Sequence, residues 1–206
     1  MNPFILGLDL GQSNDFTAVA IAEVAGDLGA QHYAVRYLRR FDLGTPYPTV
    51  VSEVRALTLT PQLRGCHVVA DATGVGRPVL DMLDQARMNP TAVTITGGDT
   101  VTSEDGHFRV PKRDLVSTVQ VLLQSGRLKI ASALPEAETL VKELLNFQVK
   151  ITANAHDVYG AWREGTHDDL VLAVALACWW GEHSPGRAWL KLIERGIGFG
   201  PWDFER

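Results

Sequence analysis

Phe4-Ile5-Leu6-Gly7-Leu8-Asp9-Leu10-Gly11, close to the start of the chain, is the most informative segment of the sequence. Seven of these eight residues are apolar or glycine, which is typical of a β-strand covered on both faces. Asp9 is the exception, because a carboxylate buried in such a strand costs several kcal/mol unless it is paired, hydrogen-bonded or bound to a metal. Asp9 therefore either begins a turn after the strand or belongs to a functional site.

Composition indicates a folded α/β domain with a sizeable core. The chain has 206 residues, of which 46% are hydrophobic and 21% charged, and its net charge is −5. That charge argues against a stand-alone, high-affinity nucleic-acid binder, but not against an enzyme whose acidic pocket is offset by bound cations. No apolar run approaches the ~20 residues that span a membrane. The absence of a secretory signal and of a CxxC pair predicts a cytoplasmic location, with Cys66 and Cys178 as buried free thiols.

The first half of the chain predicts a mixed sheet. Strands over residues 4–11, 16–24 and 32–41, joined by short turns, predict an antiparallel meander. A helix over 46–59, a strand over 66–71, a helix from Pro78 and a strand over 91–96 are expected next. Alternating strands and helices after a meander predict an α/β fold with helices on both sides of the sheet.

The second half predicts mainly helices. The expected helices cover residues 113–124, 135–145 and 170–180, the last being the most apolar, and a short extended piece is expected at 128–130. In the first of them, the residues expected to face inward are Leu115, Val119, Leu122 and Leu123. A hairpin of residues 147–151 with 158–162 is also expected. We assign residues 1–183 to one domain and residues 184–206 to a C-terminal tail.

Acidic residues adjoin core elements at three points. Asp9 lies on the first strand, Asp71 ends the strand over 66–71, and Asp168 and Asp169 begin the most apolar helix. Each has an ordinary explanation, since Asp is common in turns and acids favour the first turn of a helix. Open α/β sheets, however, place their ligands at such strand ends. The ordinary explanations do not account for every one of these acids lying directly against a core element.

Converging carboxylates would favour a bound cation. Like charges repel each other, and oxygen-only ligands suit Mg²⁺ or Mn²⁺ rather than zinc. Two such ions ~4 Å apart can hold a phosphodiester, activate a water molecule and stabilise the leaving oxygen.

Three motifs occur in order along the chain: Leu6-Gly7-Leu8-Asp9, Asp71-Ala72-Thr73-Gly74-Val75-Gly76 and Thr166-His167-Asp168-Asp169-Leu170-Val171. Over residues 4–180 the sequence resembles the nuclease domain of bacteriophage terminase large subunits, which has an RNase H-like fold. The resemblance implies that Asp9, Asp71 and one or both of Asp168 and Asp169 hold two Mg²⁺ or Mn²⁺ ions. It also implies endonucleolytic cutting of concatemeric double-stranded DNA during genome packaging, in the host cytoplasm, with the 147–162 hairpin beside the active site.

A complete terminase large subunit also carries an N-terminal packaging ATPase. This sequence has no GxxxxGK[ST] motif, and Gly74-Val75-Gly76-Arg77 does not replace it. The chain is thus either an excised C-terminal domain or a free-standing relative. The resemblance implies a packaging ATPase domain, a portal and a small terminase as partners in the full assembly.

Basic residues give candidates for DNA contact. Lys112 and Arg113 lie at the start of a predicted helix, where cations oppose the helix dipole, so contact with phosphate is one explanation and a solvated helix end is the other. Further candidates are Arg77, Arg109, Lys150 and Arg163.

Other functions compete with the nuclease. Asp9-Leu10-Gly11 followed by Thr17 resembles the phosphate-binding hairpin of actin-like ATPases and sugar kinases, but 206 residues are too few for their duplicated domain. A junction resolvase is another RNase H-like nuclease. An inactive scaffold is the non-enzymatic alternative, although a scaffold would gain stability by replacing buried charges.

Overall fold

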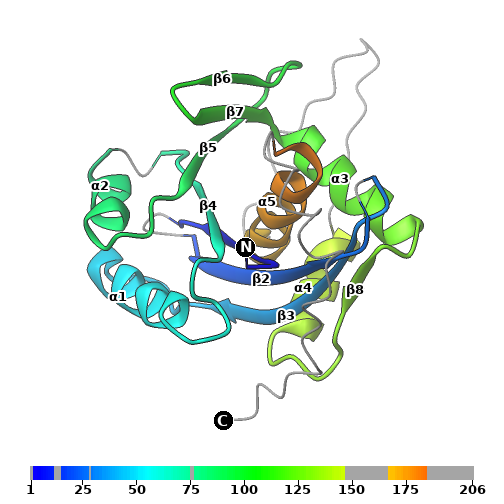
Figure 1. Cartoon of the computed structure of the whole chain (residues 1–206), viewed down its shortest axis with the longest axis horizontal. Coiled ribbons are helices and arrows are strands. Elements are labelled where there is room, and N and C mark those ends of the chain that lie inside the picture. Colours follow the sequence, from blue (N-terminus) through cyan, green and yellow to red (C-terminus); the bar gives the residue numbers. More distant parts are fainter. Residues whose placement is uncertain (1, 12–14, 28, 75–76, 147–166, 185–206) are drawn as a thin grey trace.

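The structure is a computed structural model that describes residues 2–11, 15–27, 29–74, 77–146 and 167–184. One eight-stranded sheet crosses this part of the chain in the order β6-β7-β5-β4-β1-β2-β3-β8 (Figure 1). The central strands β1, β2 and β3 form an antiparallel meander, and β4 and β5 extend the sheet in parallel from β1. The strands are β1 Phe4–Asp9, β2 Ala18–Ala25, β3 His32–Arg40, β4 His67–Asp71, β5 Thr91–Thr96, β6 Thr102–Glu104, β7 His107–Pro111 and β8 Leu128–Ile130.

Helices cover both faces of the sheet. Helices α1 (Tyr47–Thr58) and α2 (Arg77–Gln85) lie on one face, and α3 (Lys112–Gln124), α4 (Ala137–Asn146) and α5 (Asp169–His183) lie on the other (Figure 1). Each face has its own apolar cluster, because alternate residues of a strand point to opposite sides. In β1, Ile5 belongs to the cluster of α5, whereas Leu6 and Leu8 belong to the cluster of α1 and α2.

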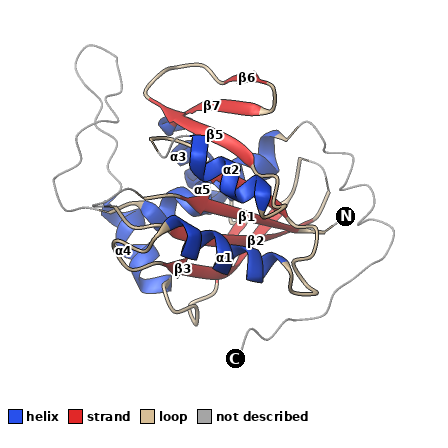
Figure 2. Cartoon of the chain, turned by 90° about the vertical axis from the view of Figure 1, so that its left-hand side faces the viewer, coloured by secondary structure: helices blue, strands red, loops and turns tan. Residues whose placement is uncertain are grey.

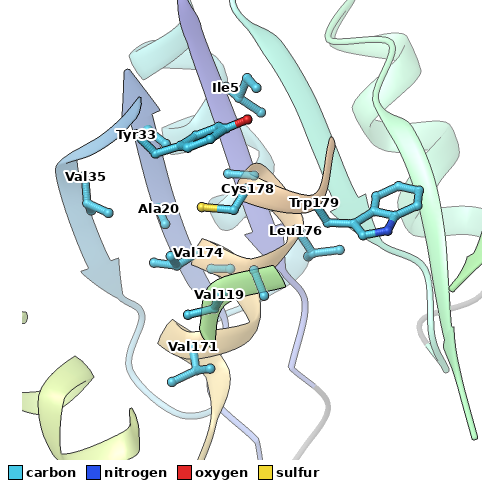
Figure 3. Close-up of a cluster of buried hydrophobic side chains, with 14 of the residues drawn as sticks. Ile5, Ala20, Tyr33, Val35, Val119, Val171, Val174, Leu176, Cys178 and Trp179 are labelled. Atoms are coloured by element: carbon cyan, nitrogen blue, oxygen red, sulfur yellow. The ribbon is translucent and has the colours of Figure 1, made fainter. Parts of the chain in front are cut away.

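Helix α5 is the most buried helix of the described chain. It is apolar all round, and a helix of that composition is stable only when it is covered on every side. The sheet covers one side of it, and α3 and α4 cover the others. In Figure 3, Val174 and Cys178 of α5 lie on the side of the helix that faces Ala20 of β2 and Val35 of β3, and all four belong to one apolar cluster.

Small side chains let α5 approach the sheet closely. A Cβ atom at Gly7 of β1 would lie 2.0 Å from the carbonyl oxygen of Ala173, so only glycine fits there. Strand β2 presents a run of small residues to the same face, namely Ala18, Ala20 and Ala22. The backbone of α5 consequently lies directly on β1, and the position of its first turn relative to the end of β1 is fixed.

The predicted elements are confirmed across the described chain, with their ends shifted by at most three residues. The sheet is mixed and flanked by helices on both sides, as expected. Cys178 is buried and both thiols are free, but Cys66 is only half-buried. The inward placement of Leu123 was wrong, since its side chain is 38% exposed and Val116 is buried instead.

The hairpin of β6 and β7 was missed. The two strands pair antiparallel at the edge of the sheet, at the top of Figure 2. Strand β6 is only three residues long and fully exposed, so it has no apolar alternation to reveal it. Its turn holds Asp105 at φ 49° and Gly106 at φ 79°, and Asp-Gly is a common pair in tight hairpin turns.

Two predictions concern residues that are not described. These are the 147–151 and 158–162 hairpin and, apart from Ser184, the 184–206 tail. The division into a domain and a tail stays a prediction. No helix in the described ranges is both long enough and apolar enough to cross a membrane.

Replacing Gly7 with Ala is expected to destabilise the protein by about 3 kcal/mol or more, because the atom in the way is a backbone oxygen that moves only with α5. Urea unfolding followed by circular dichroism measures the change. Gly97→Ala is the matched control, since its new Cβ would meet nothing within 4 Å and should change stability by no more than ~0.5 kcal/mol. Equal stability of the Gly7→Ala variant and the parent would contradict the tight contact.

Candidate active site

The strand register places charged residues in one row across the sheet. Asp9 at the end of β1 pairs with Ala18 of β2, and Ala18 pairs with Arg40 of β3. The parallel pairing of β1 with β4 runs to Leu8 and Ala70, so the next residues, Asp9 and Asp71, are also neighbours. Side chains at matched positions of adjacent strands point to the same face. The row is therefore Asp71, Asp9, Ala18 and Arg40, and it faces α5.

The first turn of α5 reaches this row. Asp9 lies two residues beyond Gly7 on the same face of β1, and Asp169 lies one helical turn before Ala173, which packs on Gly7. From the contact of Gly7 with Ala173, two residues along the strand and one turn along the helix cover similar distances. Asp169 therefore lies beside Asp9. Ala18, between Asp9 and Arg40 in the row, is too small to separate the sheet from this turn.

Asp9 and Asp71 form a buried carboxyl pair. Each of these residues is only 6% exposed, and their carboxyl groups interact directly with each other. Burial raises the pKa of Asp9 well above its ordinary value, and the charges of Asp71, Asp169 and Asp168 raise it further.

Burial also raises the pKa of Asp71. The hydrogen bond that the backbone N–H of Thr73 donates to its Oδ1, at 2.7 Å, opposes this rise and fixes the carboxylate in place. Lys112 opposes it as well.

Two cations lie among these acids. Nζ of Lys112 is 2.5 Å from Oδ2 of Asp168, and a guanidinium nitrogen of Arg40 is 3.3 Å from Oδ2 of Asp169. Arg40 is also ion-paired with Glu143 of α4. Burial raises the pKa of Asp169 to about 6, against the opposing charge of Arg40.

Arg40 and Glu143 are the site residues that the sequence predictions missed. Arg40 lies two residues after Leu38, on the buried face of β3, and Glu143 lies three residues after Leu140, on the buried face of α4. A charged residue at an inward-facing position of an amphipathic element is the signal that would have found both. Burial raises the pKa of Glu143 to about 7, so it is costly to ionise without Arg40.

The proposed DNA-contacting residues are placed differently from one another. Arg113 pairs with Asp99 at 2.7 Å at the start of α3, just outside the carboxyl cluster. The side chain of Arg77 is 88% exposed at the start of α2, and Arg109 is exposed on β7. Lys150 and Arg163 lie outside the described residues. Contact of these residues with DNA stays a prediction.

The donor chemistry of the site fits a hard cation. Asp9, Asp71, Asp168 and Asp169 offer only oxygen atoms, and Oδ2 of Asp169 is buried without a hydrogen-bond partner. Within the described ranges, no three Asp, Glu, His or Cys side chains are placed so that together they could hold a metal ion as they stand. Asp71 is instead held by the N–H of Thr73, Asp168 by Lys112 and Asp169 by Arg40.

Comparison with known proteins identifies the relatives of this chain. A family model described as the terminase RNaseH-like domain matches residues 6–178. The terminase large subunit of Thermus phage G20c is 28% identical over 174 residues, which cover 84% of this chain and 31% of that protein. This chain thus spans about a third of the length of that relative.

Solved structures give the same result. The large terminase nuclease of thermophilic phage G20c superposes with a TM-score of 0.62 at 26% identity, covering 88% of this chain and 82% of that one. A structure of the same nuclease with bound zinc has a TM-score of 0.57 at 24% identity, covering 88% and 81%.

The carboxyl cluster should make the metal-free protein less stable as pH rises. Between about pH 4, where unfolded Asp and Glu ionise, and pH 6 to 7, the folded protein keeps protons on Asp169 and Glu143 that the unfolded chain has lost. Stability from these groups is therefore greatest at low pH and lost by about pH 7. We expect the melting temperature in EDTA to fall between pH 5 and pH 7.5.

Asp9→Asn tests whether the cluster causes this fall. It removes one charge from the cluster, so the fall should become shallower and the melting temperature at pH 7.5 should rise. Asp27→Asn, which removes an exposed acid elsewhere, should leave the slope unchanged. A parent whose melting temperature increases with pH over this range would contradict the electrostatics of the site.

Proposed function

The chain belongs to the family of terminase RNaseH-like domains, and from this we propose that it is a metal-dependent endonuclease that cleaves double-stranded DNA during viral genome packaging. The observation that carries the proposal is that Asp9, Asp71 and the Asp168-Asp169 turn lie together at the carboxyl ends of β1 and β4. A fold without a function there would be more stable with apolar residues in these positions.

Carboxylates from β1, β4 and the start of α5 would hold the metal. We assign Asp9, Asp71 and one or both of Asp168 and Asp169 as ligands of two Mg²⁺ or Mn²⁺ ions. Such ions, when bound, orient the phosphodiester, activate a water molecule and stabilise the leaving oxygen. Support comes from the oxygen-only donors and from Oδ2 of Asp169, which is buried and accepts no hydrogen bond.

The chain's own residues orient these ligands. Strand pairing fixes Asp9 beside Asp71, and the N–H of Thr73 holds one oxygen of Asp71. The contact of Gly7 with Ala173 fixes the turn that carries Asp169. Asp169 is almost fully buried beside Arg40, whereas the side chain of Asp168 is 21% exposed and paired with Lys112.

The larger assembly is also part of the proposal. Because the G20c relative is a terminase large subunit about three times as long, we infer that this domain works beside a packaging ATPase domain, with a portal and a small terminase, in the host cytoplasm. Its substrate would be concatemeric double-stranded DNA. The family match does not favour the kinase alternative, and no contact in the described residues does so.

Asp71→Asn tests the nuclease directly. The variant keeps the shape of the side chain and removes a charge, so in EDTA it should be at least as stable as the parent. Nicking of supercoiled plasmid with Mn²⁺ should nevertheless be lost, because an amide is a poorer ligand than a carboxylate. The rise in melting temperature that Mn²⁺ gives the parent should shrink. Cleavage at the parental rate would show that Asp71 is only a turn residue.

Arg113→Ala tests contact with DNA. In the non-cleaving Asp71→Asn background, the change should weaken binding of duplex DNA and lower the slope of log K against log salt by about one, the effect of one lost phosphate contact. Fluorescence anisotropy over a range of salt concentrations measures the slope, and Lys112→Ala should behave similarly. Arg64→Ala is the control. Arg64 is exposed and precedes β4, whereas Asp71 lies at the other end of that strand. An unchanged slope would make Arg113 an ordinary surface residue.

A further inference from the structure

A buried ion pair lies directly behind Asp169. Arg40 comes from β3 and Glu143 from α4, and their side chains are 16% and 6% exposed. The pair therefore joins the sheet to a helix at the point where α5 begins. A buried pair of this kind gives little net stability, because removing two charges from water costs about as much as their attraction returns. Its position beside the carboxyl cluster suggests a role other than stability.

Glu143 caps α5 from another helix. Asp168 occupies the N-cap position, where a carboxylate ordinarily accepts a hydrogen bond from a backbone N–H two or three residues later. Asp168 makes no such bond, and its side chain is paired with Lys112 instead. Oε2 of Glu143 accepts from the N–H of Val171, at 3.1 Å. The first turn is thus anchored by a carboxylate that comes from α4.

Arg40 links this anchor to Asp169. Its guanidinium contacts Glu143 and lies 3.3 Å from Oδ2 of Asp169. The guanidinium also lies over the ring of Phe16, 4.6 Å from the ring centroid, and that ring makes an edge contact with His167. Arg40 is therefore enclosed on several sides and has little freedom to release Asp169.

We propose that Arg40 and Glu143 are positioning residues that hold the Asp169 carboxylate and the first turn of α5 in the geometry required to bind the divalent cation. This rests on the proposed nuclease function. The two charges cancel, so the pair orients Asp169 without changing the net charge of the site. Residues that orient metal ligands in this way typically contribute ten- to a hundredfold to metal affinity.

The test is the double variant Arg40→Met/Glu143→Gln. It leaves the net charge unchanged, and Gln keeps an oxygen that can accept from Val171. Because both charges of the pair are removed together, neither is left buried alone, and a cooperative melting transition in EDTA shows that the variant is folded. Calorimetric titration with Mn²⁺ in the absence of DNA should show affinity reduced at least tenfold. At saturating Mn²⁺, plasmid nicking should show a lower kcat with an unchanged KM for DNA.

The neighbouring residue on the same strand supplies the matched control. Arg39 pairs with Glu53 of α1, on the opposite face of the sheet. Arg39→Met/Glu53→Gln makes the same chemical change away from the site, so Mn²⁺ affinity and kcat should stay at the parental values.

Single variants provide a second measurement. Arg40→Gln and Glu143→Gln should each lower Mn²⁺ affinity, and the loss in the double variant Arg40→Gln/Glu143→Gln should be smaller than their combined losses, because the two residues act as one unit. A folded Arg40→Met/Glu143→Gln variant that binds Mn²⁺ like the parent would overturn the proposal. A parent that neither binds Mn²⁺ nor nicks DNA would instead overturn the nuclease function, so the two failures are distinguishable.

Discussion

The contact between Gly7 and the backbone of α5 is the constraint on which the site depends. Side chains between a strand and a helix ordinarily hold the two backbones apart, but here glycine on β1 and alanines on β2 let the helix backbone contact the sheet. That contact fixes the position of α5 along the direction of β1. Because Asp9 and Asp169 each lie a short step from it, two acids that are 160 residues apart in the sequence become neighbours.

Bringing these acids together opposes folding. Asp9, Asp71 and Asp169 are buried, and burial together with the charges of Asp71, Asp169 and Asp168 raises the pKa of Asp9. The fold meets part of this cost with the N–H of Thr73, with Lys112 and with Arg40. None of these devices would be needed if the positions were apolar, as almost every other position of β1 and α5 is. The cluster is therefore explained by chemistry at the site and not by the stability of the fold.

Local pattern determined how much could be predicted from the sequence. The apolar strands and helix and the acids at their ends are visible in the order of residues, so the mixed sheet and the approximate place of Asp9, Asp71, Asp168 and Asp169 followed from it. Arg40 and Glu143 were missed because their role depends on which β3 and α4 side chains meet the start of α5, which is set by tertiary packing. The polar β6 strand was missed because its pairing partner, and not its own composition, makes it a strand.

The site carries more negative than positive groups. Five carboxyl groups, those of Asp9, Asp71, Asp168, Asp169 and Glu143, lie with two cationic side chains, Arg40 and Lys112. Burial raises the pKa of Asp169 to about 6 and that of Glu143 to about 7, and the charges of neighbouring carboxylates add to both rises. A divalent cation supplies the missing positive charge in a form that the oxygen donors prefer. The same charge imbalance that weakens the metal-free fold thus favours the binding of a divalent cation.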